Sequence, residues 1–92
     1  MNRLVDVLLV TSPGCHYCDD ALDLLDELAQ AIPMKIRTVP IFSDEGRSII
    51  VRHKVPFPPV LIIDGRFFGY GRVSRRKLEA HLAGASTSRR VG

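Results

Sequence analysis

The chain has 92 residues, which is enough for one small domain, and 46% of them are apolar, so a buried core can form. A net charge of +3 is too small to indicate a nucleic-acid-binding protein. The apolar run near the N-terminus is interrupted by Asp6, has no small-residue cleavage site after it and is too short to span a bilayer. We therefore expect a cytoplasmic protein with no membrane partner.

The first predicted elements are a strand and a helix with two cysteines between them. Residues 4–11 form a nearly continuous run of Val and Leu, which is typical of a central strand buried on both faces. After a Ser-Pro-Gly turn, apolar residues recur at helical spacing over residues 19–32, and Pro33 ends this helix. The pair Cys15 and Cys18 thus lies at the junction of the strand and the helix.

The middle of the chain predicts a second strand and a second helix. The alternation of apolar and polar residues over 34–39 is typical of a strand with one exposed face. The intervening helix places this strand parallel to the first one. Ser43 is the expected N-cap of a helix that runs to about His53. Residues 55–59 contain three prolines and cannot form a regular helix.

The last part of the domain predicts a hairpin and a final helix. Residues 60–63 and 66–68 are expected to pair as antiparallel strands around an Asp-Gly turn. Ser74 is the expected N-cap of the final helix, which ends where the domain ends. The chain therefore divides into one domain, residues 1–84, and a flexible basic tail, residues 85–92.

The cysteine pair is the feature that most directly indicates chemistry. A thiol at the start of a helix faces unpaired N–H groups and the positive end of the helix dipole, which favour the thiolate. Such a setting lowers a cysteine pKa from about 8.5 to roughly 3.5–7.5, and the thiolate is the nucleophile in disulfide exchange. A structural disulfide would close too short a loop to constrain the unfolded chain much, and zinc usually needs four ligands. We therefore interpret Cys15 and Cys18 as a redox centre, with metal binding and an inert pair as the alternatives.

The order β-α-β-α-β-β-α with Cys-x-x-Cys before the first helix resembles the minimal thioredoxin fold of glutaredoxins. Residues 14–18, Gly-Cys-His-Tyr-Cys, are similar to the glutaredoxin Cys-Pro-Tyr-Cys. Residues 59–65 resemble the family's cis-proline, the strand after it and the Asp-Gly hairpin, and residues 69–71 resemble its Gly-Gly before the last helix. The resemblance extends from Leu4 to about Gly84. It implies an α/β fold with a four-stranded mixed sheet flanked by helices.

The resemblance also implies roles for individual residues. Cys15 is expected to be the attacking cysteine, and Cys18 the resolving cysteine one turn deeper. Pro59 is expected to follow a cis peptide bond beside the pair. His16 and Tyr17 complete the candidate catalytic set, with Tyr17 at the rim of the site. The candidate substrate-binding residues are Pro58, Pro59, Gly71 and Arg72, and no residue is expected to bind a metal.

Two departures from the family bear on reactivity and on substrate binding. His16 replaces the usual proline, and a protonated imidazole beside Cys15 would stabilise the thiolate. We therefore expect the reduced Cys15 thiol to have a pKa below about 7. Pro58 precedes the expected cis-proline and has no N–H, so one backbone hydrogen bond to an extended substrate should be missing. Its absence is expected to change substrate selection.

A third departure concerns glutathione, which many glutaredoxins bind. Thr11 and Ser12 stand where a Lys or Arg often precedes the cysteine motif. Tyr70 separates the glycine pair, and Arg72 stands where an acidic residue would hold the γ-glutamyl amine. A cationic Arg72 would repel that amine. We therefore expect no cofactor and doubt that glutathione binds, which leaves reduction by a reductase as a credible alternative.

These features predict a thiol–disulfide oxidoreductase that acts on protein or low-molecular-weight disulfides. The expected partners are a disulfide-containing protein and a reductase or small thiol that regenerates the dithiol. The alternatives are a redox-sensing protein-binding module of the same fold and a metal or iron–sulfur carrier. The basic residues near Arg72 and in the tail lack the interleaved aromatics of a nucleic-acid site. A monomeric protein that binds an acidic protein partner explains these basic residues better.

Overall fold

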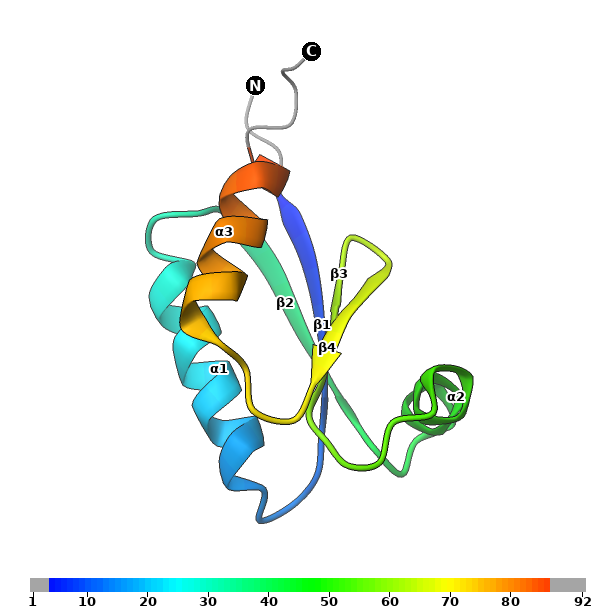
Figure 1. The fold of residues 1–92 in the computed structure, drawn as a ribbon. Coiled ribbons are helices and arrows are strands. Elements are labelled where there is room, and N and C mark those ends of the chain that lie inside the picture. The colour runs from blue at the N-terminus through cyan, green and yellow to red at the C-terminus, as the bar shows by residue number, and fades with distance from the viewer. Residues whose placement is uncertain (1–3, 87–92) are drawn as a thin grey trace.

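The computed structural model describes residues 4–86 (Figure 1). Within this range the elements follow the order β1 (Val5–Thr11), α1 (His16–Leu28), β2 (Met34–Pro40), α2 (Asp44–His53), β3 (Val60–Ile63), β4 (Arg66–Tyr70) and α3 (Arg75–Ser86). The strands form one sheet in the order β2-β1-β3-β4. β1 is parallel to β2 and antiparallel to β3, and β3 is antiparallel to β4. The predicted element order and the four-stranded mixed sheet are confirmed.

The sheet separates two apolar clusters. Helices α1 and α3 cover one face of the sheet, and α2 lies on the other side (Figure 1). β1 serves both clusters because successive side chains of a strand point to opposite faces, so Leu9 joins the larger cluster and Val10 the smaller one. The buried members of the larger cluster are Val5, Val7, Leu9, Ala21, Leu25, Leu28, Leu61, Ile63, Leu78 and Leu82. Those of the smaller cluster are Val10, Val55, Val60 and Ile62.

Helix α1 is shifted toward the cysteines relative to the helix that periodicity predicts. It begins at His16 instead of residue 19, with Cys15 as its N-cap, so the cysteine motif forms the first helical turn. It ends at Leu28 instead of residue 32. Tighter turns follow it, in which the Gln30 N–H donates to the Glu27 carbonyl oxygen (3.2 Å) and the Ala31 N–H to the Leu28 carbonyl oxygen (3.1 Å).

The hairpin of β3 and β4 forms as predicted, but β4 is longer. The turn residues Asp64 and Gly65 have φ angles of 52° and 80°, the left-handed pair that a type I′ turn requires. β4 continues to Tyr70 instead of Phe68, and a register irregularity against β3 accommodates the additional length. The turn before α3 therefore starts at Gly71, where a φ of +71° favours glycine.

Both predicted N-caps are confirmed. The Ser43 Oγ accepts a hydrogen bond from the Gly46 N–H (3.0 Å) at the start of α2. The Ser74 Oγ accepts one from the Lys77 N–H (3.3 Å) at the start of α3. Because these side chains satisfy N–H groups that have no partner inside the helix, they fix where each helix begins.

The last helix ends slightly further along the chain than predicted. Helix α3 continues to Ser86, so the first two residues of the predicted tail belong to the helix. Alanine is the best helix former and is frequent here, which explains the extension. The rest of the predicted tail, residues 87–92, lies outside the described residues. Among residues 4–86, no helix combines the length and the apolar character that crossing a membrane requires.

Candidate active site

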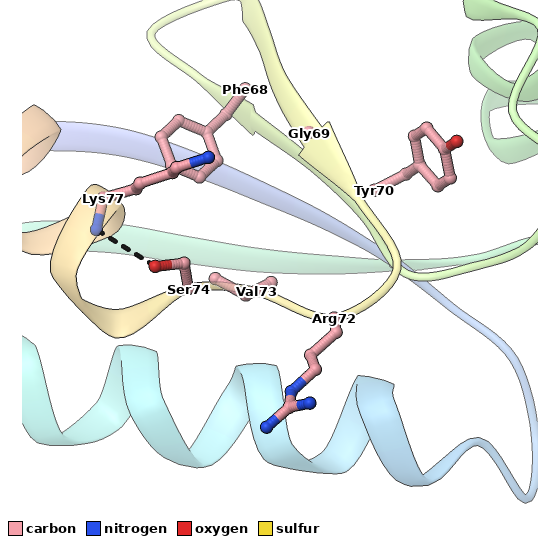
Figure 2. A pocket seen from close by; sticks show the side chains of 7 residues that line it. All are labelled: Phe68, Gly69, Tyr70, Arg72, Val73, Ser74 and Lys77. Atoms are coloured by element: carbon pink, nitrogen blue, oxygen red, sulfur yellow. Dashed lines mark hydrogen bonds between the residues drawn. The ribbon is translucent and has the colours of Figure 1, made fainter.

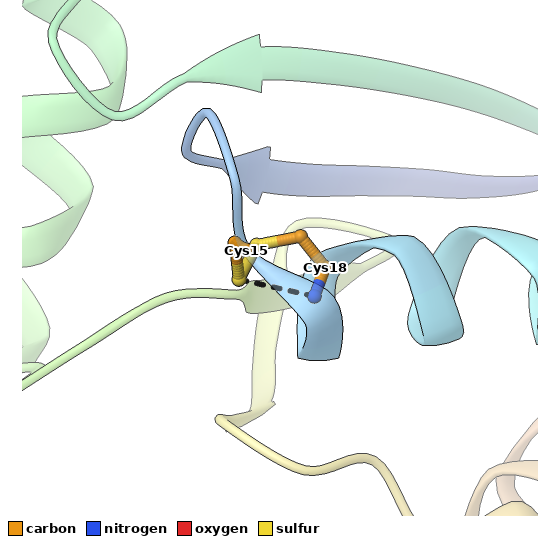
Figure 3. Close-up of a disulfide and its surroundings, with 2 residues drawn as sticks. All are labelled: Cys15 and Cys18. Atoms are coloured by element: carbon orange, nitrogen blue, oxygen red, sulfur yellow. Dashed lines mark hydrogen bonds between the residues drawn. A yellow bond between two sulfur atoms is a disulfide. The ribbon is translucent and has the colours of Figure 1, made fainter.

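The two predicted cysteines form a disulfide at the start of α1 (Figure 3). β1 ends at Thr11, and a turn then brings the chain to Cys15. The extended backbone of Cys15 (φ −95°, ψ 109°) makes it the N-cap of α1. Cys18 follows within the first turn, with its Cα 5.2 Å from that of Cys15. The pair thus lies at the edge of the sheet where β1 ends.

The two sulfur atoms have different surroundings. Cys15 is partly exposed, whereas Cys18 is only 3% exposed. The Cys18 N–H donates a hydrogen bond to the Cys15 Sγ (3.1 Å), so this sulfur caps the helix as a serine or aspartate oxygen commonly does. In the reduced protein, the same N–H and the helix dipole would favour negative charge on Cys15. The geometry therefore gives Cys15 the accessible sulfur and Cys18 the shielded one.

We predict that the reduced Cys15 thiol titrates with a pKa below about 7, because its sulfur faces a helix N–H and the positive end of the α1 dipole. A protonated His16 next to it lowers the value further. Thiolate absorbance against pH measures the titration. The absorbance change that is lost in Cys15→Ser belongs to the Cys15 thiol. A midpoint near the ordinary value of about 8.5 contradicts the first statement, and an unchanged midpoint in His16→Ala contradicts the second.

The two residues between the cysteines are exposed on the first turn of α1. The imidazole of His16 has no hydrogen bond or ion pair within the part of the chain that the structure describes. Tyr17 is 46% exposed, and it lines a pocket of about 80 Å³ together with Asp20 and Arg72. The structure therefore brings Tyr17 and Arg72, two of the predicted site residues, to one place.

The predicted cis peptide bond is present between Pro58 and Pro59. Pro59 is buried where the chain enters β3. Because Val10 pairs with Val60 in the antiparallel register, Pro59 lies across from Thr11, at the end of β1 that leads to the cysteines. Figure 3 shows the segment that enters β3 passing beside the disulfide. The proline loop and the cysteine pair thus share one edge of the sheet.

Sequence reasoning missed two aromatic side chains at this edge. Phe57 and Tyr70 are 48% and 44% exposed, and their rings meet edge to face with centroids 5.5 Å apart. A Cβ on Gly71 would lie 2.8 Å from the Phe57 ring, so a glycine fits this position best. The Gly71 N–H donates to the Pro59 carbonyl oxygen (2.8 Å), which ties the turn after β4 to the proline loop. An aromatic residue between two prolines was the sequence signal that could have revealed Phe57.

Arg72 follows this turn and lines a second pocket, of about 250 Å³. Figure 2 shows Arg72 reaching toward α1 on one side of this pocket, and Lys77 on the other side beside Phe68. Tyr70 and Val73 also line it. The predicted residue Arg72 thus lines both pockets, and Gly71 precedes it in the chain.

The ion pairs among residues 4–86 lie outside the cysteine site. Glu27 (2.6 Å) and Glu79 (3.1 Å) bind the Arg75 guanidinium and raise the pKa of Arg75. Arg37 donates two hydrogen bonds to Glu45 (2.9 and 2.8 Å), which lowers the pKa of that carboxyl. All these groups are exposed, so they add little stability. Within residues 4–86, no three His, Cys, Asp or Glu residues are placed to hold a metal ion together.

Comparisons with known proteins agree on both the fold and the family. Solved structures with a similar fold include a mutant thioredoxin from Halobacterium salinarum NRC-1, with a TM-score of 0.67 and 16% identity over 95% of this chain and 78% of that one. Thioredoxin O2 from Arabidopsis thaliana in the oxidized state has a TM-score of 0.68 and 20% identity over 91% of this chain and 76% of that one. At such identities the likeness shows the fold alone.

No curated protein sequence matches the chain. The glutaredoxin family model, in contrast, matches residues 7–68, which is more than half of the chain. The matched stretch runs from β1 into β4 and includes both the disulfide and the cis-proline. On this evidence the chain belongs to the glutaredoxin family.

Proposed function

We propose that the protein is a thiol–disulfide oxidoreductase in which Cys15 attacks the substrate and Cys18 resolves the intermediate. The observation that carries the proposal is the difference between the two sulfurs. Cys15 is accessible and accepts the Cys18 N–H at 3.1 Å, whereas Cys18 is 3% exposed. A reactive, low-pKa thiol that can be reached by substrate is the property that disulfide exchange needs.

The proposed reaction transfers two electrons in two exchange steps. The Cys15 thiolate attacks one sulfur of the substrate disulfide, the S–S bond breaks, and the other substrate sulfur leaves as a thiolate that takes a proton from water. Cys18 then loses its proton to solvent and attacks the Cys15 Sγ. The mixed disulfide breaks, the second substrate thiol leaves, and the Cys15–Cys18 disulfide remains. A small thiol or a reductase returns the pair to the dithiol by the reverse exchange.

The surrounding residues are proposed to hold the substrate against the Cys15 sulfur. Tyr17 forms the rim on the α1 side. Pro59 and Gly71 form the opposite side, where the hydrogen bond between their backbones joins the proline loop to the turn after β4. The carbonyl oxygen of Pro58 is proposed to accept a substrate N–H, since proline itself has no N–H to donate.

Steady-state reduction of insulin and of a small mixed disulfide tests the proposed function. Turnover is expected, and two donor systems, glutathione with its reductase and thioredoxin reductase alone, identify the source of electrons. We expect weak use of glutathione, because Arg72 replaces the acidic residue that would hold its γ-glutamyl amine. A protein that shows no turnover with either donor, but binds a partner only when oxidised, would instead be a redox-sensing binding module.

Pro58→Val is expected to change which disulfides are reduced, because valine restores an N–H beside the site. One added backbone hydrogen bond corresponds to about 1 kcal/mol, or roughly fivefold in the rate constant for an extended peptide substrate. The measurement is kcat/KM for a peptide mixed disulfide relative to that for a small one. An unchanged ratio in a folded Pro58→Val variant contradicts the role of Pro58.

A further inference from the structure

Arg72 lies where three surface pockets meet. The small pocket separates it from Tyr17 and Asp20 of α1, and the large pocket extends from it to Lys77. A third pocket continues along the start of α3. Arg72 and Val73 line all three, so the pockets adjoin one another at these two residues. We call the three together the strip, and its small pocket reaches Tyr17 of the cysteine motif.

The cations along this strip differ in whether they already have a partner. Arg75 is paired with two glutamates. Arg72 and Lys77 form no ion pair within residues 4–86. The large pocket is lined by these two cations and by no carboxylate of the described residues, while Asp20 lines only the small pocket (Figure 2). The large pocket is therefore a half-enclosed site of positive charge that the described part of the fold leaves unneutralised.

We propose that Arg72 selects disulfide substrates whose polypeptide carries a carboxylate near the reacting cysteine, an inference that rests on the proposed oxidoreductase function. The carboxylate binds in the large pocket between Arg72 and Lys77. A guanidinium presents a planar set of N–H donors that matches the two oxygens of a carboxylate. A pocket also screens the attraction less than an open surface does. Arg72 is thus a specificity residue that acts on the charge of the substrate.

The shape of the strip fits an extended polypeptide better than a small thiol. A thiol the size of a single residue joined to Cys15 would fill only part of the strip. The strip instead runs from Tyr17, inside the cysteine motif, along the turn after β4 to the start of α3. A polypeptide that lies along it places a side chain near its cysteine over the large pocket.

Peptide mixed disulfides that differ only in charge test this inference. Three peptides with one cysteine, each joined to a neutral small thiol, carry Glu, Gln or Lys at the positions next to the cysteine. The second-order rate constant for reduction by the dithiol protein is measured for each at low salt. We expect the order Glu, Gln, Lys and a Glu-to-Lys ratio of about tenfold that falls as salt is added. Arg72→Glu is expected to lower this ratio at least tenfold.

Matched variants separate the effect of the pocket on the Glu-to-Lys rate ratio from the effect of the protein's net charge. Arg76→Glu changes the net charge by the same amount four residues along the chain, but Arg76 lines none of the three pockets, so the ratio should change less than about twofold. Arg72→Lys keeps the charge and should keep most of the preference. Equal rates for the three peptides, or an equal effect of Arg76→Glu, would refute the role of Arg72 and leave the oxidoreductase standing. Failure of the wild-type protein to reduce any peptide would refute the function itself.

Discussion

Cys15→Ser is expected to abolish disulfide reduction, with a loss of at least about a thousandfold in turnover, because a serine hydroxyl is not ionised at neutral pH and cannot replace the thiolate. Cys18→Ser is expected to behave differently. Its Cys15 still faces a backbone N–H and the dipole of α1, so the first attack proceeds. Without a second thiol, the reaction stops at the mixed disulfide.

Mass spectrometry of the two variants after incubation with a disulfide substrate measures this difference. Cys18→Ser should gain the mass of one half of the substrate, and a reductant should remove it. Cys15→Ser should gain little, because its one thiol is the 3% exposed sulfur of Cys18. Thermal unfolding of both variants beside the reduced wild-type protein serves as the folding control.

The opposite pattern would reverse the assignment of the two cysteines. An adduct that forms on Cys15→Ser and not on Cys18→Ser would make Cys18 the attacking residue, despite its burial. Adducts that form equally on both would mean that accessibility does not control the attack. Either result would remove the observation on which the proposed mechanism depends.

Local sequence signals predicted most of the fold. The nearly continuous apolar run of β1 correctly indicated a central strand, because its side chains contribute to apolar clusters on both faces of the sheet. Ser43 and the Asp-Gly turn are equally local signals. Ser43 accepts an N–H of the first helical turn, and Asp64 and Gly65 adopt the positive φ angles that the hairpin turn requires. The cysteine spacing likewise placed the disulfide, and the family resemblance supplied the cis bond at Pro59.

The parts that sequence reasoning missed depend on contacts between distant segments. Helix α1 starts at His16 because Cys15 caps it, and the periodicity of apolar residues does not reveal this cap. Phe57 and Tyr70 meet where the Gly71 N–H joins the turn after β4 to the proline loop and where Val60 pairs with Tyr70. Such contacts follow from sheet register, which a single sequence does not specify residue by residue.

The same limit applies to residues that the sequence pattern does not single out. Helical spacing predicts His53 as an ordinary surface residue of its helix, but its ring stacks on Phe67 of β4 with centroids 4.6 Å apart. His81 likewise meets Phe68 edge to face at 5.2 Å. In both pairs a helix and β4 come together from different parts of the chain. Helical spacing alone does not predict which side chain of the sheet a helix residue will contact.

Gly46→Ala is expected to destabilise the protein by about 3 kcal/mol, although alanine is the better helix former. Gly46 is the buried residue of α2. A Cβ at this position would collide with the carbonyl oxygen of Pro40 and lie 3.1 Å from the Ile41 Cα. These are backbone atoms, so no side chain can turn aside to make room. An alanine side chain fits at this position only if the helix moves away from the end of β2.

The collision also reaches the N-cap of α2. The Pro40 carbonyl oxygen already accepts the Ser43 N–H (3.1 Å) and the Ser43 hydroxyl (2.7 Å). The Ser43 Oγ in turn accepts the Gly46 N–H. Pushing the Pro40 carbonyl aside therefore weakens the hydrogen bonds that fix the start of the helix, a loss typically of about 1 kcal/mol.

Thermal unfolding of the reduced protein measures the effect. For a chain of this size, about 3 kcal/mol corresponds to a fall of roughly 12–24 °C in Tm. Gly84→Ala is the matched control, because it makes the same change in a helix where a Cβ would meet nothing within 4 Å. It should stabilise the protein by up to about 1 kcal/mol. A Gly46→Ala variant as stable as the wild type would mean that α2 can slide along the sheet. The smaller cluster, against which Ile49 and Ile50 of α2 pack, would then tolerate more than one position of this helix.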